Sequence, residues 1–117
     1  MSIKDWDLIS IVEEIKLVQR HETFVVGDIE TTGFSPEKGA EVIQIAAAKV
    51  KDGQIVDRFA TFVKPDKEIP SYITELTGIT NQDVQNAPHI QEALQSFVAF
   101  AQDNALVFHN AKFDWDT

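Results

Sequence analysis

The sequence contains no cysteine, which excludes a disulfide framework and thiolate metal sites and suits a reducing cytoplasm. It has no apolar run near the roughly 18 residues of a membrane-spanning helix, and its N-terminus shows no secretory signal. Basic residues are few, with 10 Lys and Arg against 19 Asp and Glu and a formal charge of −9. Such a surface does not hold a nucleic-acid backbone by charge alone, although acids that bind divalent cations can still serve phosphate chemistry.

The composition is that of a globular protein, with 44% hydrophobic and 25% charged residues. The length of 117 residues suits one domain. Residues 1–22 are expected to contain an amphipathic helix that packs on the domain or docks on a partner. Its apolar residues recur at helical spacing: Leu8, Ile11, Val12, Ile15 and Val18. Residues 23–117 are expected to form the body of the domain.

Three strand-like runs follow one another between Thr23 and Val63. The first, TFVVGDI, is short, apolar and rich in β-branched residues, as a buried strand is. The other two, EVIQIAAAKV and IVDRFATFV, are separated by a turn that contains Asp52 and Gly53. An Asp-Gly pair between strand-like runs is the strongest short hairpin signal. We therefore expect three antiparallel strands.

Helical signals follow the strands. Residues 70–78 are expected to form a short helix that ends at Gly78, and Thr80 with Asp83 resembles the capping box of another. A third helix is expected behind Pro88. Its apolar stripe consists of Ile90, Ala93, Leu94, Phe97, Val98 and Ala101.

Asn104 is expected to break this third helix, and ALVFHN then reads as a fourth short strand. A helical crossover before the last strand favours parallel pairing of that strand with an earlier one. The predicted fold class is α/β, with a mixed sheet of three antiparallel strands, helices, and a fourth parallel strand. KFDWDT at the end resembles the first turn of a further helix.

Two acids, Asp28 and Glu30, stand where the first strand ends. Residues two apart on a strand point to the same face, so both carboxylates project together from the edge of an apolar layer begun by Phe24 and Val26. Adjacent carboxylates repel each other, and a fold tolerates them mainly where a cation binds. Thr31-Thr32-Gly33 follow at once, with backbone amides that could turn toward an anion.

A third acid, Asp114, lies just beyond the fourth strand. Parallel pairing of that strand with the first would bring Asp114 to the same end of the sheet as Asp28 and Glu30. Three carboxylates there would suit two hard cations, Mg²⁺ or Mn²⁺, which can activate a water and stabilise the leaving oxygen of a phosphodiester. Taken alone, an Asp-x-Glu pair at a strand end is also common as simple surface charge.

Longer segments identify a family. FVVGDIETTGFSP closely resembles the first motif of the DEDD, or DnaQ-like, 3′–5′ exonucleases, which include the epsilon proofreading subunit of bacterial DNA polymerase III. HNAKFDWD resembles the second motif, and ELTGIT with NAPHIQEAL resembles the helical segment between them. The resemblance runs from Thr23 to the end of the sequence. It implies a ribonuclease-H-like fold and metal-dependent removal of nucleotides from a 3′ end.

The same resemblance implies individual roles at the metal site. Asp28 would bridge two divalent cations, Mg²⁺ or Mn²⁺, and Glu30 would ligate one of them. Asp114 would hold the second cation, directly or through water. These three acids are the predicted catalytic residues.

Other residues are implied to bind the substrate. Thr31 and Thr32 match positions that approach the terminal nucleotide and its 3′ hydroxyl. Phe34 stands where the family often has a leucine that wedges against the terminal bases, and a phenylalanine ring can stack there. His109 and Asn110 belong to the second motif and would orient the strand end. Without the motifs, Phe34 could instead belong to the core, and His109 could be an ordinary polar residue at a strand end.

The family pattern also requires a fourth acid and a general base, which belong to a third motif downstream of the second. We find no third motif after Asp114. The expectation is therefore that the sequence is the N-terminal portion of a longer exonuclease, and that these 117 residues alone are nearly inactive.

The predicted function is 3′–5′ hydrolysis of single-stranded DNA in proofreading or repair, with a DNA polymerase subunit as a possible partner. One alternative is an exoribonuclease that trims RNA 3′ ends, because the shared motifs do not report on contacts to the 2′ position. The other is a non-catalytic module that binds nucleic acid or a polymerase. ELTGIT favours the polymerase-associated branch by resemblance.

Overall fold

The structure is a computed structural model that describes residues 23–33 and 36–109. The predictions for the helix in residues 1–22 and for Phe34, Asn110 and Asp114 lie outside the described residues. Among the described residues, no helix is long and apolar enough to cross a membrane.

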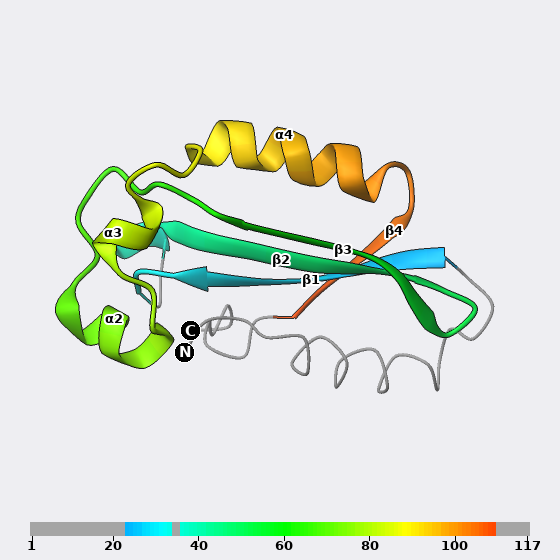
Figure 1. Ribbon diagram of the computed structural model, residues 1–117, viewed down its shortest axis with the longest axis horizontal. Helices are drawn as coiled ribbons and strands as arrows, with labels where there is room; N and C mark the ends of the chain where they lie inside the picture. Colours follow the sequence, from blue (N-terminus) through cyan, green and yellow to red (C-terminus); the bar gives the residue numbers. More distant parts are fainter. Residues whose placement is uncertain (1–22, 34–35, 110–117) are drawn as a thin grey trace.

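Four strands form one mixed sheet in the order β3-β2-β1-β4 (Figure 1). Strands β1 (Thr23–Thr31), β2 (Val42–Lys51) and β3 (Gln54–Phe62) pair antiparallel, and β4 (Ala105–His109) pairs parallel with β1. Both predictions, three antiparallel strands and a parallel fourth, are confirmed. In the β2–β3 turn, Asp52 has φ 52° and Gly53 has φ 79°, as a tight hairpin turn requires.

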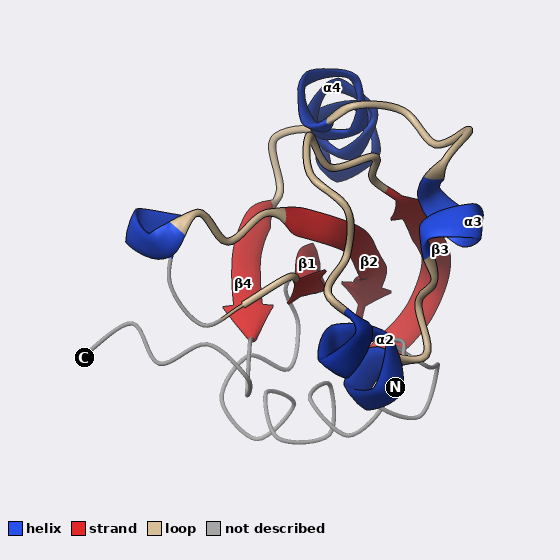
Figure 2. Cartoon of the chain, turned by 90° about the vertical axis from the view of Figure 1, so that its left-hand side faces the viewer, coloured by secondary structure: helices blue, strands red, loops and turns tan. Residues whose placement is uncertain are grey.

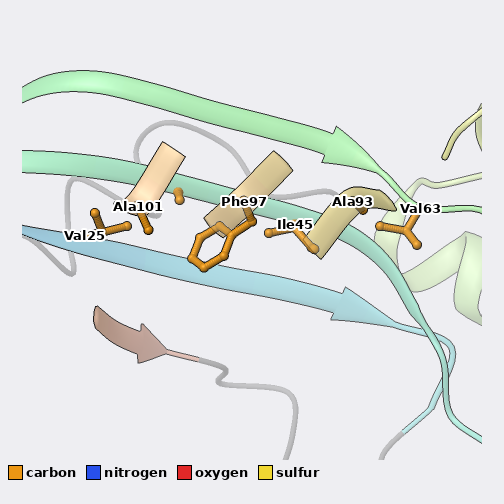
Figure 3. Packing of buried hydrophobic residues seen from close by; sticks show 7 residues of the cluster. Val25, Ile45, Val63, Ala93, Phe97 and Ala101 are labelled. Atoms are coloured by element: carbon orange, nitrogen blue, oxygen red, sulfur yellow. The ribbon is translucent and has the colours of Figure 1, made fainter. Parts of the chain in front are cut away.

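Helix α4 (Ile90–Ala101) is the crossover between β3 and β4, and it packs along one face of the sheet (Figure 1). Figure 3 shows the packing, in which Ala93, Phe97 and Ala101 of the helix lie on Val25 and Ile45 of the sheet. The helix ends three residues before Asn104, because Gln102 adopts φ 56° and leaves the helical conformation. Asn104 instead donates a side-chain hydrogen bond to the carbonyl of Ala101 at 3.0 Å.

Two shorter helices, α2 (Ser71–Thr77) and α3 (Asn81–Val84), gather at the end of the sheet toward which β1 points (Figures 1 and 2). Gly78 ends α2 in the left-handed conformation, with φ 80°, and Thr80 and Asp83 form the predicted capping box of α3. Their buried side chains make a second core with Ile43 of β2, and its members are Ile43, Ile69, Ile73, Ile79 and Val84. A single turn of 3₁₀ helix, η1 (Pro36–Lys38), lies between β1 and β2.

The face of the sheet opposite α4 is also apolar. Phe24 and Val26 of β1 are fully buried there and cluster with Val50 of β2. Alanines at positions 46 and 48 continue this face on β2, where the register places them beside Asp28 and Val26. The predicted apolar layer that precedes the acidic pair is therefore present.

Candidate functional site

Asp28 and Glu30 occupy the C-terminal part of β1, on the face of the sheet that Phe24 and Val26 begin. Asp28 is half-buried, whereas Glu30 is only 3% exposed. One carboxylate oxygen of Asp28 accepts a hydrogen bond from the N–H of Ile29 at 2.8 Å, which restrains the Asp28 side chain. Asp28 thus lies at the edge of the apolar layer, and Glu30 follows it in a buried position.

Asp28 lies between a small residue on β2, Ala46, and a histidine on β4, His109. In register, Asp28 pairs with Ala46 of β2 and with His109 of β4, and Glu30 pairs with Gln44, which is 8% exposed. The parallel strand therefore brings the start of the second motif next to the first acid. The backbone of His109 lies where the sequence predicts it. The positions of the His109 side chain, Asn110 and Asp114 stay predictions.

A β-bulge lies immediately after the acidic pair. The register shifts between Glu30 and Thr31, because Glu30 pairs with Gln44 and Thr31 pairs with Val42, so that Ile43 has no pairing partner on β1, although its carbonyl accepts from the N–H of Val63 at 2.9 Å. Ile43 is fully buried in the core formed with α2 and α3. Bulges of this kind bend a strand and redirect its side chains, and they are frequent beside active sites. Here the extra residue, Ile43, belongs to β2, opposite the point where β1 passes from Glu30 to Thr31.

The hydroxyl groups of Thr31 and Thr32 both make hydrogen bonds within the loop region. Thr31 Oγ1 donates to the carbonyl of Gly33 at 2.6 Å. Thr32 Oγ1 accepts from the N–H of Glu41 at 2.9 Å, and the N–H of Thr32 donates to the carbonyl of Glu41 at 2.8 Å. The predicted contacts of Thr31 and Thr32 with a terminal nucleotide stay predictions, as does the role of the Gly33 amide. No local sequence pattern marks Glu41 as the partner of Thr32.

The acidic pair fits a divalent cation by its donor chemistry. Two carboxylates that share one face supply the oxygen ligands that Mg²⁺ and Mn²⁺ prefer. Ala46 beside Asp28 carries only a methyl group, so no bulky side chain flanks that carboxylate from β2. Among residues 23–33 and 36–109, no group of three or more acids, histidines or cysteines is arranged to hold a metal. A third ligand would therefore have to come from elsewhere, and Asp114 is the predicted one.

An open pocket of about 460 Å³ lies on another part of the surface, between three segments of the chain: 40–42, 63–66 and 89–91. Neither Asp28 nor Glu30 lines it. The pocket is therefore distinct from the acidic pair, although Glu41, which lines the pocket, also holds Thr32.

A mixed sheet of order β3-β2-β1-β4, with a parallel β4 and paired acids at the end of the inner strand β1, defines a ribonuclease-H-like nuclease fold. The chain belongs to the exonuclease family, because the RNase T-type exonuclease profile matches residues 25–116. The family inferred from the two motifs is thereby confirmed.

Comparisons with individual proteins agree. Over 93 residues the chain is 53% identical to a PolC-type DNA polymerase III of Clostridium perfringens and 43% identical to the 3′-5′ exonuclease DinG of Bacillus subtilis. These alignments cover 80% of the chain, but only 6% and 10% of the two relatives. The nuclease domain of 3′hExo, a DEDDh family member solved with rAMP, has the same fold, with a TM-score of 0.65 at 19% identity. That match covers 77% of the chain and 52% of the solved one.

Proposed function

We propose that this chain carries part of the active site of a 3′–5′ exonuclease that removes nucleotides from the 3′ end of single-stranded DNA. The observation that supports this most directly is the pairing of β1 with β4. Asp28 and Glu30 share one face at the end of β1, and the parallel register sets His109, the first residue of the second motif, beside Asp28. Family membership supplies the reaction class, hydrolysis of a nucleic acid from one end.

In this proposal Asp28, Glu30 and Asp114 hold two divalent cations. Mg²⁺ or Mn²⁺ bound there would activate a water molecule and stabilise the leaving oxygen of the phosphodiester. The fully buried Phe24 and Val26 form a dry layer behind the acids, which strengthens the electrostatic attraction between the carboxylates and a bound cation.

The remaining predicted residues bind the end of the strand. Thr31, Thr32 and the Gly33 amide would meet the terminal nucleotide, and Phe34 would wedge against its base. His109 and Asn110 would orient the strand from the β4 side. The bulge supports these roles by its position, because the register of β2 against β1 shifts at the point where the substrate-binding residues begin.

DNA is the preferred substrate because the relatives at 43–53% identity are a PolC-type DNA polymerase III and the exonuclease DinG. A role in proofreading or repair, with a polymerase as partner, follows from the same likeness. RNA trimming is the second candidate, supported by the related nuclease domain that was solved with rAMP. The two differ in the 2′ hydroxyl, so substrates matched in sequence distinguish them.

The test uses a single-stranded DNA labelled at its 5′ end, its RNA counterpart, and Mn²⁺ or Mg²⁺. We expect Mn²⁺-dependent binding of the product dTMP and only slow shortening of the DNA from its 3′ end, because these residues carry part of the active site, with still slower shortening of the RNA. Asp28→Asn should abolish both cleavage and metal-dependent binding, because it removes the bridging carboxylate. Asp57→Asn, on the exposed part of β3, is the matched control. Absence of Mn²⁺-dependent dTMP binding in the unaltered sequence would contradict the proposal.

A further inference from the structure

Glu41, which immediately precedes β2, makes hydrogen bonds to two separate loops. Through its backbone it forms a reciprocal pair with Thr32, in which each residue donates one N–H to the other. Through its side chain it accepts from two consecutive backbone amides, from Asp66 at Oε1 over 2.8 Å and from Lys67 at Oε2 over 3.2 Å. One residue therefore joins the loop after β1 to the connection between β3 and α2.

Both ends of this link lead to the acidic pair. Thr32 lies two residues after Glu30, and its pairing with Glu41 closes the base of the loop that carries Gly33. The connection that holds Asp66 and Lys67 leads into α2, whose Ile73 packs on Ile43 at the bulge beside Glu30. Glu41 thus links two segments. Its backbone holds Thr32, which follows the two acids, and its side chain holds Asp66 and Lys67, which lead into α2.

The bond between Glu41 and Thr32 also orients a donor. Thr32 Oγ1 accepts the N–H of Glu41, and a hydroxyl that accepts in this way keeps its own proton for donation. An oxygen of a nucleotide sugar or phosphate is one group that can accept this proton. The carboxylate of Glu41 holds two amides by charge-assisted bonds, which are stronger and more restrictive than neutral ones.

We propose that Glu41 is a positioning residue that sets the Thr31–Gly33 loop against the acidic pair and thereby fixes the affinity for the 3′-terminal nucleotide. The proposal rests on the function proposed above. If Glu41 only stabilised the fold, loss of its carboxylate would lower the melting temperature but leave nucleotide binding by the folded protein unchanged.

The experiment measures binding of dTMP in the presence of Mn²⁺ by calorimetry, well below the melting temperature of each variant, together with binding of Mn²⁺ alone. Glu41→Ala should raise the Kd for dTMP about 10-fold or more, the size of effect seen for residues that orient ligating groups. The Kd for Mn²⁺ alone should not change. Glu68→Ala removes an exposed acid from the same connection and should leave both constants unchanged.

Glu41→Gln provides a second variant. Its amide oxygen can still accept from one backbone N–H, but its NH₂ group meets the other N–H as a second donor, so we expect an intermediate rise in Kd. If Glu41→Ala does not fold, the Kd of Glu41→Gln for dTMP tests the positioning role instead. A Kd for dTMP that stays at the wild-type value in the folded variant overturns the positioning role while the proposed function stands. A wild-type chain that does not bind dTMP with Mn²⁺ overturns the proposed function, and the positioning role with it.

Discussion

Gly27 lies directly beneath the ring of Phe108, where β1 meets β4. A methyl group added at Gly27 would lie 2.8 Å from Cε1, 3.1 Å from Cζ and 3.2 Å from Cδ1 of that ring. The ring is 52% exposed and stacks obliquely on Phe97 of α4, with 5.4 Å between centroids. Gly27→Ala therefore requires the Phe108 ring to move, which disturbs its contact with Phe97.

Two opposing effects set the magnitude. Overpacking costs about 1–3 kcal/mol, and loss of the Phe97–Phe108 contact accounts for about 0.5–1.5 kcal/mol of that range. Replacement of glycine by alanine gains about 0.4–1 kcal/mol by restricting the unfolded chain, since Gly27 has no positive φ that alanine would strain. The net expectation is a destabilisation of about 1–2 kcal/mol.

A double-mutant cycle isolates the clash. We expect Phe108→Ala to cost about 1–2 kcal/mol, less than for a fully buried ring because half of the side chain is exposed. In the Phe108→Ala background the added methyl has room, so Gly27→Ala should become neutral or slightly stabilising. Urea unfolding of the four proteins should give a coupling energy of at least about 1 kcal/mol. Additive free energies would refute the claim that Phe108 requires a glycine beneath it.

Two further changes test the site and the local structure. Asp28→Asn should weaken Mn²⁺ binding in calorimetry without lowering the urea midpoint, because it removes one of two like charges that repel in the metal-free protein; a large loss of stability would show that Asp28 is mainly structural. Gly78→Ala should destabilise the protein by about 1–2 kcal/mol, because Gly78 ends α2 at φ 80° and a side chain is strained there. Gly33→Ala, whose methyl would meet Ala40 at an ordinary 3.5 Å, is its control in thermal unfolding and should cost less.

Features with local signals were predictable from the sequence. The Asp52-Gly53 turn, the capping box of Thr80 and Asp83, and the end of α2 at Gly78 each depend on a few adjacent residues, and each is present. The shared face of Asp28 and Glu30 follows from the two-residue period of a strand.

Features that depend on distant contacts were not predictable in the same way. The bulge at Ile43 has no sequence signal of its own, because it arises where β2 must bury that side chain between α2 and α3. Glu41 binds amides 25 and 26 residues away. Helix α4 ends before Asn104 because the chain must turn at Gln102 to enter β4, a requirement of the crossover and not of the helix sequence.

The register of β4 against β1, which places the backbone of His109 beside Asp28, is supported by packing on the opposite face of the sheet. A shift of β4 by one residue against β1 would exchange the faces of all its side chains and move His109 away from Asp28. Phe108 favours the observed register, because Gly27 leaves room for its ring and the ring contacts Phe97 there. In this register the backbone of His109, the next residue of β4, lies beside Asp28. The packing of Phe108 beneath α4 therefore favours the register in which His109, of the second motif, pairs with Asp28.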